Sequence, residues 1–122
     1  MTYPTEEQEQ AALFKWADLM RVKYPELQLM FHIPNEGARG LIGGARQKEQ
    51  GLKSGVPDIF IPVARGKYHG MFVEMKRSDG GTESKNQKKW RDALREQGYN
   101  SVVCHGWDKA RELIEYYMQE GK

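Results

Sequence analysis

Two short apolar runs stand near the middle of the chain, with a polar stretch between them. The first covers residues 58–63 (DIFIPV) and the second covers residues 71–75 (MFVEM). The stretch between them, residues 64–70 (ARGKYHG), is polar and contains glycine. Short apolar runs bounded by such sequence are typical of strands joined by a turn. The pattern therefore predicts a β-hairpin or a tight pair of strands.

Three longer segments have the apolar periodicity of amphipathic helices. Residues 5–23 begin at Thr5, a residue suited to capping a helix N-terminus. Residues 84–97 and 109–119 show the same periodicity. The predicted apolar face of the first helix comprises Ala12, Leu13, Trp16, Ala17 and Met20. That of the last comprises Ala110, Leu113, Ile114 and Tyr117.

The remaining apolar segments complete a predicted order of elements. Residues 27–33 and 100–105 have the composition of strands, and a short helix is predicted over residues 45–50. The order is therefore helix, strand, short helix, two strands, helix, strand, helix. A mixed β-sheet flanked by helices accommodates this order, so we expect an α/β fold. A chain of 122 residues has the length of one domain, and we expect residues 1–122 to form it.

Composition excludes several classes of function. The 19 basic and 17 acidic residues give a formal charge of only +2, so any nucleic-acid surface must come from local clustering of charge. A single cysteine, Cys104, excludes an internal disulfide and a cysteine-based zinc site. No apolar run approaches the roughly 20 residues that span a bilayer. The N-terminal residues are polar and acidic, unlike a signal peptide, so we expect a cytoplasmic protein without membrane association.

Three charged residues interrupt the two central apolar runs. Asp58 opens the first run, and Glu74 and Lys76 stand at the end of the second. Glu74 and Lys76 point to the same face of a strand, and Asp58 on a paired strand can reach that face. Unpaired buried charge is costly, and a Mg²⁺ ion held by the carboxylates would remove the cost. In the alternative, Asp58 caps a turn and Glu74 pairs with Lys76 on an exposed face; the residues alone favour neither.

Several motifs resemble one family of nucleases. Pro57-Asp58 followed by Glu74-Met75-Lys76 resembles the PD-(D/E)XK signature. The segments PNEG (residues 34–37), GLKSGVPD (51–58) and FVEMK (72–76), with Gln87 and Trp90 after them, resemble the VRR-NUC family in the same order. The resemblance extends over nearly the whole chain. It implies a restriction-endonuclease-like core and an endodeoxyribonuclease, dependent on Mg²⁺ or Mn²⁺, that hydrolyses phosphodiester bonds.

The resemblance also implies roles for the residues of the central runs. Asp58 and Glu74 would hold the metal together with the backbone carbonyl of Met75. Lys76 would position or deprotonate the attacking water, or stabilise the charge that develops on the phosphate. Gln87, in the helix that follows, would orient Lys76 or the water.

Related nucleases place an acidic residue of the first helix beside the metal. Glu9 is our first choice for this catalytic and metal-binding role, because it lies at the N-terminal edge of the predicted apolar face. Glu6 is the alternative. Without the resemblance, both would be read as solvated residues of a first helical turn.

Polar and basic residues around these motifs are expected to contact the DNA backbone. They come from the glycine-rich segment after Pro34, from the segment before Asp58, and from the start of the helix at residues 84–97. They are Asn35, Arg39, Arg46, Lys53, Ser54, Lys85 and Lys89. Gly55 would permit the backbone to approach a ligand closely. For each residue, a solvated surface position is the competing interpretation.

Standalone members of this family occur in phages and bacteria and are expected to be homodimers. They act on branched DNA such as four-way junctions, in the manner of a Holliday-junction resolvase. If phage-encoded, the protein would act in the cytoplasm of the host cell. The alternative is a non-catalytic DNA-binding or assembly module that retains the fold. The presence of Asp58, Glu74 and Lys76 argues against that alternative.

Overall fold

The computed structural model describes residues 2–34 and 49–120. Helical elements come first in this part of the chain, three strands follow, and a helix, a strand and a helix complete it. In order, they are α1 (Glu6–Leu19), η1 (Met20–Val22), η2 (Pro25–Leu29), β1 (Phe31–His32), β2 (Ile59–Ile61), β3 (Met71–Lys76), α3 (Lys85–Glu96), β4 (Asn100–His105) and α4 (Trp107–Gln119). Here η denotes a 3-10 helix. The predicted α/β class is confirmed.

The strands form one open, mixed sheet in the order β1-β2-β3-β4. β1 pairs antiparallel with β2, and β2 pairs antiparallel with β3. The two central runs therefore form the antiparallel pair that the sequence predicted. β4 pairs in parallel with β3, because α3 carries the chain back across the sheet before β4 begins.

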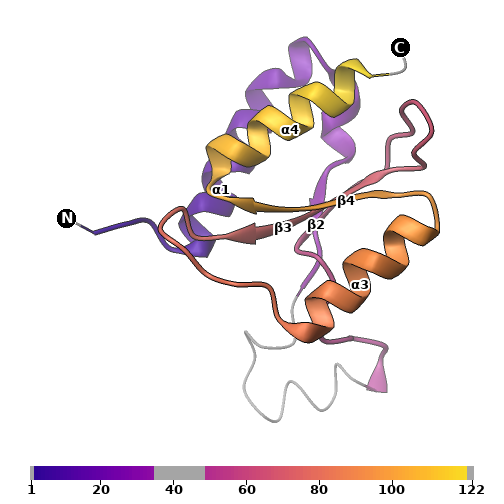
Figure 1. Ribbon diagram of the computed structural model, residues 1–122. Coiled ribbons are helices and arrows are strands. Elements are labelled where there is room, and N and C mark those ends of the chain that lie inside the picture. Colours follow the sequence, from indigo (N-terminus) through magenta and orange to yellow (C-terminus); the bar gives the residue numbers. More distant parts are fainter. Residues whose placement is uncertain (1, 35–48, 121–122) are drawn as a thin grey trace.

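Helices lie on both faces of the sheet. α1 and α4 lie together over one face, and α3 runs across the other (Figure 1). Successive side chains of a strand point to opposite faces. Met71, Val73 and Met75 of β3 are buried in the core with residues of α1 and α4. Glu74 and Lys76 consequently point to the face on which α3 lies.

Two predicted elements in the N-terminal part have wrong boundaries. Residues 27–29 lie in η2 rather than in a strand, and the strand is reduced to Phe31–His32. Pro25 is at the first position of η2, where its fixed φ favours a helical turn. The predicted helix of residues 5–23 ends at Leu19 and tightens into η1.

One predicted apolar position also differs. Leu113 is 41% exposed, and Met118 is buried on the core side of α4 instead. Trp90 of α3 is half-buried, and no residue of that helix is fully buried. Residues 45–48 of the predicted short helix lie outside the described residues. In the part of the chain that the structure covers, no helix is long and apolar enough to cross a membrane.

Candidate active site

The pairing of β2 with β3 brings the two central carboxylates together. The last paired residues are Ile59 and Val73, so the next residue on each strand, Asp58 and Glu74, stands opposite the other. Beyond this point the backbone of β3 has no partner in β2. The Met75 N–H donates to Asp58 Oδ2 instead, at 2.7 Å. The Asp58 side chain thus holds β3 in place where the strand ladder ends.

The backbone of Asp58 is itself anchored by β1. Its carbonyl oxygen accepts from the Ile33 N–H at 2.6 Å and lies 2.9 Å from Nδ1 of His32. A carbonyl oxygen can only accept, so Nδ1 of His32 carries the proton. This agrees with a structural role for His32, as expected for a histidine inside an apolar run.

Glu74 and Lys76 form a buried ion pair that Gln87 bridges. Their side chains are almost fully enclosed, and Lys76 Nζ lies 3.9 Å from Glu74 Oε2. Gln87 Nε2 donates to Glu74 Oε2 at 3.0 Å, and Lys76 Nζ donates to Gln87 Oε1 at 3.0 Å. A buried ion pair is tolerated only when further hydrogen bonds satisfy its polar atoms. The amide of Gln87 supplies one donor and one acceptor for this purpose.

The start of α3 fixes the position of the Gln87 side chain. Ser84 is the N-cap, and its Oγ accepts from the Gln87 N–H at 3.1 Å. Gln87 Oε1 accepts in return from the Ser84 N–H at 2.8 Å. This reciprocal arrangement is a capping box, which stabilises a helix N-terminus. The same amide therefore caps α3 and bridges the ion pair.

The electrostatic environment of Glu74 is unfavourable for its charged form. Its pKa is raised from 4.5 to about 9, chiefly by burial, then by the charge of Asp58 and by a hydrogen bond with Asp58. Lys76 lowers the pKa, and Glu6 raises it. When Glu74 is ionised, its buried Oε1 has no hydrogen-bond donor among the described residues. Such an orphaned oxygen beside a second carboxylate fits a divalent cation.

The protein donors for such a cation are few. Within residues 2–34 and 49–120, no group of three or more His, Cys, Asp or Glu side chains is gathered as for a metal ion. The pair Asp58 and Glu74 remains. Mg²⁺ is commonly held by one or two carboxylates with waters and substrate phosphates, so this pair is sufficient.

The two acidic residues predicted in the first helix have different surroundings. Glu6 is exposed in the first turn of α1, and its charge acts on Glu74. Glu9 is buried, and its Oε1 accepts from the Trp107 N–H at 3.2 Å, at the first residue of α4. Glu9 therefore caps α4, a role that no local pattern of residues indicates.

The predicted DNA-contacting residues are partly covered by the structure. Lys53, Ser54, Lys85 and Lys89 are exposed around the start of α3 and the segment before β2. Asn35, Arg39 and Arg46 lie outside the described residues. On α3, Lys88 pairs with Asp92 and Arg91 pairs with Glu83. The described residues provide no ion-pair partner for Lys85 or Lys89, which leaves both ammonium groups available to phosphates.

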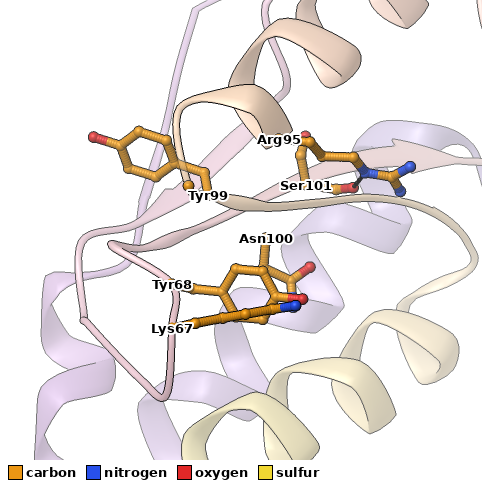
Figure 2. A pocket seen from close by; sticks show the side chains of 7 residues that line it. Lys67, Tyr68, Arg95, Tyr99, Asn100 and Ser101 are labelled. Atoms are coloured by element: carbon orange, nitrogen blue, oxygen red, sulfur yellow. Dashed lines mark hydrogen bonds between the residues drawn. The ribbon is translucent and has the colours of Figure 1, made fainter.

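A separate hollow of about 440 Å³ opens near the C-terminal end of α3. It is lined by Lys67, Tyr68, Arg95, Gly98, Tyr99, Asn100 and Ser101. Figure 2 shows Arg95 and Ser101 on one side of the β4 ribbon and Lys67 with Tyr68 on the other. None of the predicted catalytic residues lines it, so the carboxylates and the hollow are distinct places on the molecule.

The fold and the site together define a class of protein: a mixed-sheet α/β domain with a carboxylate pair and a lysine suited to phosphodiester chemistry. The family model of the VRR-NUC domain matches residues 4–108, and the chain belongs to this family. A solved structure described as a VRR_NUC domain protein is 30% identical, with a TM-score of 0.85; the match covers 100% of this chain and 94% of that one. A comparison with curated proteins finds no match. The predicted family is confirmed, and the chain is a nuclease-type, DNA-processing domain.

Proposed function

We propose that the protein is a metal-dependent endodeoxyribonuclease that hydrolyses phosphodiester bonds in branched DNA. The observation that carries the proposal is the buried Oε1 of Glu74, which lacks a donor among the described residues and lies beside Asp58. Asp58, Glu74 and the carbonyl of Met75 would hold Mg²⁺ or Mn²⁺. When bound, the metal supplies a Lewis acid and lowers the pKa of a coordinated water.

The side chains around the carboxylates have complementary tasks in this proposal. Gln87 keeps Lys76 Nζ at the edge of the carboxylate pair. There the ammonium group can orient the attacking water or stabilise the charge that develops on the phosphate. For the acid contributed by α1, we propose Glu6 in place of Glu9. The charge of Glu6 acts on Glu74, whereas Glu9 is engaged with the N-terminus of α4.

Substrate recognition is proposed to rest on backbone contacts. Lys53, Lys85 and Lys89 would contact phosphates, which carry no base sequence, so the protein would recognise the shape of DNA. A homodimer would present two sites to a four-way junction and could make paired nicks. One copy of this site cannot cut two strands at once.

The proposal is tested by cleavage of end-labelled four-way junction, flap and linear duplex DNA. Wild type and Glu74→Gln are compared in Mg²⁺, Mn²⁺ and EDTA. Glu112→Gln is the matched control, because Glu112 is an exposed carboxylate on α4. We expect metal-dependent, symmetric nicking of the junction by wild type and the control, and at least a 100-fold loss in Glu74→Gln, since a charged metal ligand is removed.

Other outcomes would revise the proposal at different points. Equal cutting of all three substrates would keep the nuclease and refute the selectivity for branched DNA. DNA binding without cleavage in either metal would refute the nuclease and support the non-catalytic DNA-binding module. Junction nicking by a protein that stays monomeric, measured by light scattering, would refute the homodimer.

A further inference from the structure

The segment that leads into Asp58 is packed tightly against the first turn of α3. Gly55 is buried and has a φ of +91°. A Cβ at this position would lie 2.7 Å from the backbone carbon and Cβ of Asn86 and 2.9 Å from its carbonyl oxygen. Those atoms belong mainly to the backbone of a helix, so a side-chain rotation cannot relieve the contact. Only glycine fits here without displacing α3.

A hydrogen bond reinforces the same contact. Asn86 Nδ2 donates to Ser54 Oγ at 3.3 Å. Gln87, which bridges Lys76 and Glu74, is the next residue of α3. On the other side of the contact, the chain runs from Gly55 through the buried Pro57 directly to Asp58.

These two parts of the site are otherwise joined through β3, because Asp58 accepts from the Met75 N–H and Gln87 bridges Glu74 and Lys76. Asp58 precedes β2, on the far side of β3 from β4. α3 packs on β4 and carries Gln87 at its start. The contact of Gly55 and Ser54 with Asn86 therefore links the Asp58 segment to the turn that carries Gln87.

We propose that Gly55, Ser54 and Asn86 form a clamp that sets the position of Gln87 relative to Asp58 and Glu74. They are positioning residues for the nuclease site, so the inference rests on the proposed function. The sequence suggested that Gly55 lets the backbone approach a ligand. In the structure the close approach is to α3, so the clamp explains why glycine is required at position 55.

The clamp is tested with a pair of matched glycine variants. Gly51 has a φ of +103° and nothing within 4 Å of a built Cβ, so Gly51→Ala incurs the left-handed strain alone. Gly55→Ala incurs similar strain and also meets Asn86. We expect kcat for DNA cleavage to fall about 10- to 100-fold in Gly55→Ala, with KM within about threefold of wild type, because misplaced catalytic groups lower turnover. Gly51→Ala should stay close to wild type.

A second measurement does not depend on activity. The side-chain amide resonances of Gln87 are assigned in a ¹⁵N NMR spectrum by their loss in Gln87→Glu. They should shift in Gly55→Ala and Asn86→Ala and stay in place in Gly51→Ala. Asn86→Asp removes the donor, but its carboxylate can accept from the Ser54 hydroxyl in the reverse direction, so it should retain more activity than Asn86→Ala.

The outcomes separate the clamp from the proposed function. If wild type does not cleave DNA, the nuclease proposal fails, and the Gln87 resonances still decide the clamp. Should Gly55→Ala not fold, Ser54→Ala and Asn86→Ala provide the test, because they remove the hydrogen bond without a clash. Unchanged Gln87 resonances in all clamp variants would overturn the clamp. A loss of DNA affinity in Gly55→Ala at unchanged kcat would do so as well, and would return Gly55 to the ligand-contacting role.

Discussion

The raised pKa of Glu74, which lies opposite the carboxylate of Asp58, makes the stability of the protein depend on pH. Its pKa is raised from 4.5 to about 9, first by burial and then by Asp58. In the unfolded chain the carboxyl ionises near its ordinary pKa, so between these pH values the folded state binds more protons. Without divalent metal, we expect the free energy of unfolding to fall as pH rises from about 4.5 to about 9. One such group contributes at most about 1.4 kcal/mol per pH unit.

Urea unfolding in EDTA across this pH range measures the effect in wild type and Glu74→Gln. The glutamine cannot ionise, so the variant should show a weaker pH dependence and should be the more stable protein at pH 8. Parallel pH profiles for the two proteins would contradict the raised pKa. Adding Mg²⁺ at pH 8 should stabilise wild type more than Glu74→Gln, since a ligand that binds only the folded state stabilises it.

Among the elements, the start of α3 combines a helix cap with a bridge to the Lys76–Glu74 pair, and one substitution can separate the two. Glutamate at position 87 can still accept from the Ser84 N–H, but it cannot donate to Glu74. We expect Gln87→Glu to keep the helix cap and to lower kcat by about 100-fold or more, with a loss of stability only at pH values where the new carboxylate meets an ionised Glu74. Gln87→Ala should lose both stability and activity.

The first helix offers the control for this prediction. α1 begins with the same kind of capping box, in which the Gln8 side chain bonds to Thr5 and not to Glu74 or Lys76. Gln8→Glu should therefore leave cleavage unchanged. Calorimetry and single-turnover cleavage of all three variants provide the measurements. Full activity in Gln87→Glu would show that the amide of Gln87 serves the helix alone.

The same element shows what sequence can and cannot predict. The apolar periodicity of residues 84–97 predicted α3 within a residue or two, and Ser84 with Gln87 has the spacing of the capping box that begins this helix. Asp58, Glu74 and Lys76 could be placed together because strand periodicity is local. The contacts of Glu9 with Trp107 and of Ser54 with Asn86 could not be predicted, because they join residues 98 and 32 positions apart through helix packing.

The error at residues 27–29 has a local cause. The alternating Leu27 and Leu29 imitate a strand, whereas Pro25 starts a helical turn.

At the scale of the whole molecule, DNA binding must arise from the distribution of charge. The net charge of +2 gives little attraction by itself. Lys85 and Lys89 stand at the start of α3, close to Gln87 and the ion pair. Lys67 provides a matched cation, because it lines the hollow near the opposite end of α3 (Figure 2). If the carboxylate site is where DNA binds, the two groups of lysines should contribute very differently.

We expect Lys85→Ala and Lys89→Ala each to weaken DNA binding, and Lys67→Ala to leave it unchanged. Each lost phosphate contact should lower the slope of log Kd against log salt concentration by about 0.9, since one fewer counterion is released. Fluorescence anisotropy with a labelled four-way junction measures both quantities at about 50–200 mM salt, a range over which such affinities change by orders of magnitude. The same salt slope in wild type and Lys85→Ala would contradict a phosphate contact there. A reduced slope in Lys67→Ala would instead extend the DNA path along α3 to the hollow, because the lysine in that hollow would then contact a phosphate too.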